Sequence, residues 1–225
     1  MVLQDRLDQL KADFESGARG YKPSRDTLDR MHRATAELIA SGIASKARKA
    51  GDQAPRFTLH AADGQAVASE ALLARGPLVV SFYRGVWCPY CNLELQALEA
   101  ALPDIEALGA SLVAISPQTP ANSRRSQRDN SLTFPILSDE KSQVAAAFGV
   151  RFKLAEDLVQ LYKSFGADLP VVNDDPAWVL PMPARYVIDR GGVIAYAEVN
   201  PDYTQRPDPS ELLPVLDRLQ MSPTI

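Results

Sequence analysis

Two closely spaced cysteines are the residues of this sequence best suited to do chemistry. They are Cys88 and Cys91, the two cysteines of the chain, and Pro89 and Tyr90 separate them. The preceding run, 78–83, is typical of a buried strand, and proline suits the first position of a helix because its missing N–H needs no partner there. Both sulfurs then lie in the first helical turn, where free N–H groups and the helix dipole favour a thiolate. One cysteine can attack a substrate while the other closes a disulfide.

Two other uses of the cysteine pair must be weighed against redox chemistry. A zinc site would need further ligands, and the two histidines, His32 and His60, lie in unrelated segments without ligand spacing. Two inert, buried thiols are the other alternative. The strand, loop and helix around the pair favour a redox dithiol, so neither a metal nor another cofactor is expected.

Side chains next to the dithiol are candidates for supporting roles. Arg84 precedes Cys88 by four residues and could stabilise a thiolate or a peroxide, or could be an exposed loop charge. Trp87 could contact a substrate or only shield the dithiol. Glu94 is expected to be a solvated helix charge. The late, proline-rich segment 202–207 could form a loop near the site.

The elements around this site predict an α/β architecture. Residues 1–50 contain two amphipathic helices, the second capped by Ser24, and each must bury its apolar stripe on the main domain or on another subunit. Over 51–225, strands alternate with helices, which indicates a sandwich around a mostly parallel sheet. Strands are expected at 57–60, 78–83, 111–116, 134–137, 185–188 and 193–199, helices at 89–102, 120–130, 141–148, 153–165 and 210–219, and an irregular segment at 171–183.

Composition excludes several classes of protein. The chain has 225 residues, 46% of them hydrophobic and 23% charged, which is typical of a globular domain plus an appendage. A net charge of −4 argues against a nucleic-acid or anionic-membrane partner. No window approaches the roughly 18 apolar residues of a membrane span, and the first residues lack the apolar core of a secretory signal. A cytoplasmic location, where thiols stay reduced, is therefore expected.

Four segments resemble known proteins of the thioredoxin superfamily. The run Trp87-Cys88-Pro89-Tyr90-Cys91 is similar to the superfamily's active site. Three others resemble the alkyl hydroperoxide reductase/thiol-specific antioxidant (peroxiredoxin) family, namely 51–59, 134–139 and 186–194. The resemblance implies a thioredoxin-like fold, a central mixed sheet flanked by helices, over 51–225, with 1–50 as an N-terminal helical extension.

The resemblance also implies roles for the residues of the motif. Peroxiredoxins carry Pro-x-x-x-Thr/Ser-x-x-Cys at the peroxidatic cysteine. Placed on that pattern, Cys91 takes the peroxidatic position, Cys88 the Thr/Ser position and Arg84 the proline position. Cys91 is therefore preferred as the attacking residue, whereas thioredoxin-like exposure would favour Cys88.

The family's activating arginine has no direct counterpart. Its position falls at Pro183, which instead resembles the cis-proline of thioredoxins, so a cis Met182–Pro183 bond is expected. Arg185 lies two residues further on and faces the same side of its strand. It could replace the missing arginine, although a surface arginine is the favoured interpretation.

The resulting hypothesis is a cytoplasmic thiol-dependent peroxidase. A thiolate reduces hydrogen peroxide or an organic hydroperoxide, the second cysteine condenses with the sulfenic acid, and thioredoxin or a glutathione system reduces the disulfide. A thiol–disulfide oxidoreductase, with Cys88 as nucleophile and Pro183 gating the substrate, is the first alternative. A non-enzymatic redox-sensing module is the second. The N-terminal helices could also form a homodimer.

Overall fold

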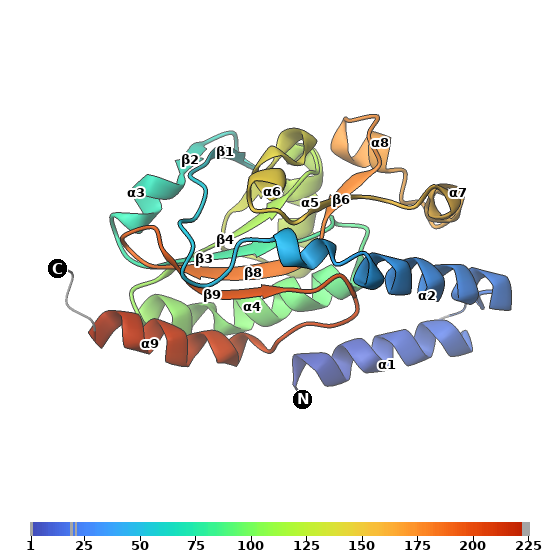
Figure 1. The fold of residues 1–225 in the computed structure, drawn as a ribbon, viewed down its shortest axis with the longest axis horizontal. Helices are drawn as coiled ribbons and strands as arrows, with labels where there is room; N and C mark the ends of the chain where they lie inside the picture. Colours follow the sequence, from blue (N-terminus) through green and yellow to red (C-terminus); the bar gives the residue numbers. More distant parts are fainter. Residues whose placement is uncertain (1, 19, 21, 222–225) are drawn as a thin grey trace.

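A seven-stranded sheet with helices on both faces forms the body of the protein (Figure 1). The computed structural model describes residues 2–18, 20 and 22–221. The strand order is β2-β1-β5-β4-β3-β8-β9, and β6 and β7 form a second, two-stranded sheet. The strands are β1 (Thr58–Ala61), β2 (Ala66–Ala68), β3 (Leu78–Phe82), β4 (Ser111–Ser116), β5 (Ile136–Ser138), β6 (Arg151–Lys153), β7 (Val179–Pro181), β8 (Ala184–Ile188) and β9 (Ile194–Val199).

The large sheet is mixed, not mostly parallel. Strand β4 runs parallel to both of its neighbours, β3 and β5, whereas β8 pairs antiparallel with β3 and with β9. At the other edge β1 pairs antiparallel with β5 and with β2. The mostly parallel arrangement expected from the alternation of strands and helices is wrong because two hairpins, β1–β2 and β8–β9, flank the parallel centre. The mixed sheet implied by the family resemblance is confirmed.

The helices form a layer on each face of the sheet. Alternation along β3 places Val79 against the α4 side and Val80 against the opposite side, so each face has its own apolar cluster. The helical segments are α1 (Leu3–Ser16), α2 (Arg25–Ala40), η1 (Ile43–Lys46), α3 (Ser69–Leu73), α4 (Pro89–Ala107), α5 (Pro120–Asn130), η2 (Glu140–Ser142), α6 (Gln143–Ala147), α7 (Glu156–Ser164), α8 (Leu169–Asn173), η3 (Pro209–Leu212) and α9 (Leu213–Met221). Among the described residues, no helix has the length and apolarity needed to cross a membrane.

Local sequence patterns predict the central elements well and the small sheet poorly. The expected strand at 111–116 and helix at 120–130 match β4 and α5 to the residue. Helix α4 continues five residues past its expected end, through Pro103, because Ile105 beyond it is still buried in the core. Strand β6 has one residue, Lys153, inside an expected helix and its other two residues in no expected element, and strand β7 lies in the segment expected to be irregular. They pair with each other across 25 intervening residues, and such pairing leaves no local periodic signal.

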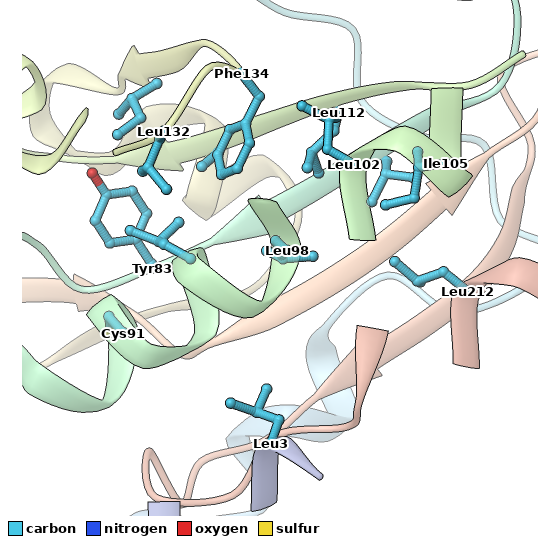
Figure 2. Packing of buried hydrophobic residues seen from close by; sticks show 14 of the residues in the cluster. Leu3, Tyr83, Cys91, Leu98, Leu102, Ile105, Leu112, Leu132, Phe134 and Leu212 are labelled. Carbon is cyan, nitrogen blue, oxygen red and sulfur yellow. The ribbon is translucent and has the colours of Figure 1, made fainter. Parts of the chain in front are cut away.

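The first helix of the N-terminal extension packs on the main domain of its own chain. Leu3, Leu7 and Leu10 lie in the cluster formed by α4, and Figure 2 shows Leu3 in the same cluster as Leu98. Helix α2 lies beside α1 (Figure 1), and none of its residues is fully buried. Ser24 caps α2 as predicted, because its hydroxyl accepts a hydrogen bond from the Thr27 N–H at 3.1 Å.

Truncating Leu7 tests whether α1 belongs to the core. Because Leu7 has no exposed surface, Leu7→Ala is expected to lower the free energy of unfolding by about 2–5 kcal/mol. Chemical denaturation followed by circular dichroism measures this. Gln9→Ala, on the exposed face of the same helix, should change it by less than about 0.5 kcal/mol. Equal effects of the two substitutions would mean that α1 does not pack as described.

Candidate functional site

The two cysteines lie where β3 passes through a short loop into α4. Cys88 is the N-cap residue of α4, Pro89 occupies its first turn, and Cys91 follows within that turn, as the sequence predicts. Both thiols are free. Cys88 is 1% exposed and Cys91 0%. The N-terminal end of α4, with its positive dipole, therefore faces two buried sulfurs.

A buried glutamine fixes the loop that carries the dithiol. Gln118, just after β4, accepts a hydrogen bond from the Val86 N–H at 2.8 Å and donates one to the Tyr83 hydroxyl at 2.7 Å. Gly85 has φ +138°, and a Cβ atom there would lie 2.7 Å from Nε1 of Trp87. Only glycine fits this position, so the path of the loop from Tyr83 to Trp87 is tightly defined.

Arg84 is buried in an aromatic cage and is not an exposed loop charge. Its guanidinium carbon lies 4.1 Å from the ring centre of Tyr203 and 4.8 Å from that of Trp87. Its Nη2 donates to the Tyr162 hydroxyl at 3.2 Å. Among the described residues no carboxylate forms an ion pair with it, so the negative charge facing this cation is that of the cysteines.

A second buried cluster lies on the Cys91 side. Glu94 Oε1 pairs with Arg185 Nη2 at 2.9 Å, and its Oε2 pairs with Arg206 Nε at 2.6 Å. Arg206 Nη2 lies 3.9 Å from the Cys91 sulfur. The predictions of a solvated Glu94 and a surface Arg185 are both wrong. The segment 200–208 folds over β8 and α4 and excludes water from all three charged side chains.

Helix α1 anchors the segment that carries Arg206. The Arg206 N–H donates to Oε1 of Gln4 at 2.9 Å, and the Leu3 N–H donates to a carboxylate oxygen of Asp208 at 3.0 Å. The late segment near the site is therefore held by the start of the chain, and Arg206 reaches Cys91 from that anchored position.

The surroundings shift the pKa values of the two thiols in opposite directions. Although burial by itself would raise the pKa of Cys88, the hydrogen bond from Cys91 and the positive charges of Arg84 and Arg206 lower it to about 5. Burial raises the pKa of Cys91, and its hydrogen bond to Cys88 and the charge of Cys88 raise it further. The reduced dithiol therefore carries one negative charge, held on Cys88.

The Met182–Pro183 bond is trans, so the prediction of a cis bond is wrong. No peptide bond in the described part of the chain is cis. Pro183 links β7 directly to β8, with the Met182 N–H donating to the Val150 carbonyl and the Pro183 carbonyl accepting from the Asn200 N–H. Pro183 nevertheless lines a cavity of about 240 Å³ together with Arg84 and Tyr203.

A larger cavity lies directly over Cys88. Its volume is about 500 Å³, within the usual range for small-molecule sites. Cys88, Trp87 and Arg84 form one side of it, and aromatic and aliphatic side chains from the two N-terminal helices and from the end of α7 form the others. Cys91 does not line this cavity and has no exposed surface.

Sequence reasoning missed two residues of this site, Gln118 and Tyr162. Tyr203 and Arg206 lie in the segment 202–207 that could form a loop near the site, but the sequence indicates no role for either. Burial raises the pKa of Tyr162 and of Tyr203, so both hydroxyls stay protonated. Nothing in the local sequence marks Tyr162. Within the described residues no group of three metal-ligating side chains is close enough to hold an ion.

Comparison with known proteins identifies relatives of the domain that carries this site. The AhpC/TSA family model matches residues 50–197. The putative peroxiredoxin Rv2521 of Mycobacterium tuberculosis is 35% identical over 99 residues, which are 44% of this chain and 62% of the relative. Peroxiredoxin Bcp of Escherichia coli is 33% identical over 102 residues, 45% of this chain and 65% of the relative.

A redox protein of another kind is also similar. The thiol-disulfide oxidoreductase ResA of Halalkalibacterium halodurans is 28% identical over 104 residues, 46% of this chain and 58% of the relative. The chain thus spans less than two thirds of the length of each of these three relatives.

Solved structures show the same fold. Peroxidoxin BcpB from M. tuberculosis superposes with a TM-score of 0.59 at 22% identity, covering 76% of this chain and 97% of that chain. The reduced 2-Cys peroxiredoxin of Plasmodium vivax superposes with a TM-score of 0.59 at 18% identity, covering 77% of this chain and 83% of that chain. The thioredoxin-like fold implied by the sequence resemblance is confirmed.

The lowered pKa of Cys88 predicts its reactivity with pH. A group whose pKa falls to about 5 stays ionised at neutral pH, so the rate of Cys88 alkylation by iodoacetamide should level off by about pH 7 and be half-maximal near pH 5. Mass spectrometry of quenched samples identifies the alkylated residue. Arg84→Met should raise the midpoint by about one pH unit or more. A midpoint near that of a free thiol in the unsubstituted protein would contradict the described electrostatics.

The buried Glu94 pair predicts a large loss of stability. Glu94→Gln leaves Arg185 and Arg206 buried without a carboxylate and should lower the free energy of unfolding by about 3–5 kcal/mol. Urea titration at pH 7 measures this. Glu106→Gln, at an exposed position of the same helix, is the matched control and should have little effect. If the two variants unfold alike, the cluster is not buried as described.

Proposed function

Because the chain belongs to the AhpC/TSA family, we propose that it is a thiol-dependent peroxidase in which Cys88 and Cys91 reduce hydrogen peroxide or an organic hydroperoxide. One observation carries this proposal. A cysteine with a strongly lowered pKa lies at a helix N-terminus, under a buried arginine and facing a cavity. A nucleophilic thiolate, a cation for the departing oxygen and a partly dry site are what cleavage of an O–O bond requires.

Cys88 is the proposed attacking residue, although the family position favours Cys91. Cys88 lines the cavity, has the lower pKa and lies within the field of Arg84. Cys91 is covered and keeps its proton at neutral pH, because burial and the hydrogen bond to Cys88 raise its pKa. In this assignment Cys91 is the resolving residue.

In the proposed oxidative half-reaction, the hydroperoxide is reduced and Cys88 is oxidised. The Cys88 thiolate attacks the terminal oxygen of the hydroperoxide, the O–O bond breaks, and the leaving alkoxide or hydroxide takes up a proton to give an alcohol or water. Cys88 becomes a sulfenic acid. Arg84 stabilises first the thiolate and then the negative charge that develops on the oxygens.

Formation of the disulfide follows from the change in charge. Once Cys88 is a sulfenic acid, the neighbouring negative charge that raised the pKa of Cys91 is gone, while Arg206 and Arg84 still lower it. Cys91 therefore loses its proton more readily and attacks the Cys88 sulfur. The hydroxyl group of the Cys88 sulfenic acid leaves and combines with the proton from Cys91 to form water. An external thiol, from thioredoxin or a glutathione system, then supplies two electrons.

Thiol–disulfide exchange is the second candidate function. A low-pKa cysteine at the first position of the CxxC pair favours it, as does the similarity to ResA. The trans bond at Pro183 and the N-terminal helices over Cys88 favour a small substrate instead of an extended protein segment. A cytoplasmic location and a homodimer remain predictions.

Single-turnover oxidation tests the peroxidase proposal without a reductant. Reduced protein is mixed with hydrogen peroxide or tert-butyl hydroperoxide, and the fluorescence of Trp87, which contacts the Arg84 guanidinium, reports the reaction. The second-order rate constant should exceed that of free cysteine by about 10³-fold or more, in line with acceleration by charge stabilisation and positioning. Cys88→Ser should abolish the fast reaction.

The Cys91→Ser variant assigns the second role. It should still react with peroxide, but the product should be a sulfenic acid that dimedone traps, with no disulfide. Loss of the fast phase in Cys91→Ser alone would reverse the two roles. A rate no better than that of free cysteine, combined with rapid reduction of a small disulfide, would favour the second candidate.

A further inference from the structure

The cavity over Cys88 is closed by parts of the chain that the family match does not include. Leu10 and Phe14 of α1 and Met31 of α2 line it, and all three precede residue 50, where the match begins. Phe14 meets Phe165 edge to face at 6.1 Å, which joins α1 to the end of α7 across the opening. Access to Cys88 is therefore governed by the N-terminal helices.

Several contacts hold these two helices against each other and against the main domain. Leu10 is 4% exposed and belongs to the main core. His32 on α2 contacts Glu15 on α1 at 2.9 Å, and Arg33 pairs with Asp157 on α7 at 3.6 Å. A protein reductant must bring its own cysteine to the Cys88 sulfur, which is 1% exposed. It could do so only by displacing α1, whereas a small thiol fits the cavity as it stands.

Arg84 is the single cationic side chain among the described residues that line this cavity. It is 4% exposed and has no carboxylate partner in the described part of the chain. In the reduced protein the Cys88 thiolate balances its charge. When Cys88 is joined to Cys91 in a disulfide, that negative charge is lost, and a buried cation without a counter-ion is costly. In the oxidised site, the uncompensated positive charge of Arg84 therefore favours binding of an anion in the cavity.

From these observations we infer that the reductant of the Cys88–Cys91 disulfide is a low-molecular-weight thiol that carries a carboxylate, and that Arg84 binds this carboxylate in the cavity. The inference rests on the proposed function in one respect, the existence of an oxidised dithiol. It selects between the two kinds of reductant that the family resemblance leaves open.

The reductive half-reaction then proceeds in two balanced exchanges. The thiolate of the small molecule attacks the Cys88 sulfur, the bond to Cys91 breaks, and Cys91 leaves as a thiolate that takes up a proton. A second molecule of the thiol attacks the small molecule's sulfur in the mixed disulfide and releases the Cys88 thiolate. Two small thiols are oxidised to their disulfide, and the dithiol is reduced.

Three thiols of similar size and different charge test the inference. The disulfide form is prepared with diamide, and its reduction by 3-mercaptopropionate, 2-mercaptoethanol and cysteamine is followed by tryptophan fluorescence at equal thiolate concentrations. Each rate is divided by that of the same thiol with bis(2-hydroxyethyl) disulfide, which removes differences in intrinsic nucleophilicity. The anionic thiol should be faster than the neutral one by about tenfold or more, and cysteamine should be slowest.

Variants of the arginine locate the effect. Arg84→Met should reduce the ratio of anionic to neutral thiol to about one, and Arg84→Lys should keep most of it. The ratio cancels any general effect of the substitution on the dithiol. Arg128→Met, an exposed arginine, is the control and should leave the ratio unchanged. A ratio near one in the unsubstituted protein overturns the inference even if neither Arg84 variant folds.

Comparison of glutathione with thioredoxin, a protein reductant, tests the inference in a second way. Glutathione should reduce the disulfide faster than thioredoxin does when both are supplied with their reductases at equal thiol concentration. Faster reduction by thioredoxin would overturn the inference. Because the disulfide is made chemically, this test does not depend on peroxidase activity. Fast peroxide oxidation with no charge preference would reject the small anionic thiol and leave the peroxidase proposal intact.

Discussion

The site depends on an excess of buried positive charge. Three guanidinium groups, those of Arg84, Arg185 and Arg206, lie within the protein close to the dithiol, and one buried carboxylate, that of Glu94, faces two of them. Charges of one sign cannot be held in a medium of low dielectric constant without compensation. A negatively charged sulfur supplies part of it, so ionisation of Cys88 and burial of the arginines support each other.

This mutual dependence makes the acidity of each sulfur a function of the other's chemical state. While Cys88 is a thiolate, Cys91 keeps its proton and donates it in a hydrogen bond. Oxidation of Cys88 removes that acceptor and that charge and leaves Arg206 beside Cys91. In the proposed mechanism, the order of the two chemical steps therefore follows from this change in the charge of Cys88.

The sequence predicts those features whose causes are local. The cysteine pair in the first turn of α4, the Ser24 cap and the strand and helix bounds of β4 and α5 all follow from neighbouring residues. The burial of Glu94 could not be predicted in this way, because its partners lie 91 and 112 positions away. Its spacing on α4, three residues after Cys91 and four before Leu98, places it on the buried face of the helix, but no neighbouring residue in the sequence supplies the cations that allow a carboxylate to be buried there. Arg206 and Tyr162 likewise join the site only through the tertiary fold.

The hydrogen bonds between α1 and the segment 200–208 give the N-terminal extension a further significance. The Gln4 side chain accepts from the backbone N–H of Arg206, the arginine that reaches Cys91, and the Leu3 N–H donates to the side chain of Asp208 two residues further on. A domain boundary drawn at residue 50, where the family match starts, would cut through this arrangement. The residues that surround Cys91 thus come partly from outside the segment that the family model matches, on both its N-terminal and its C-terminal side.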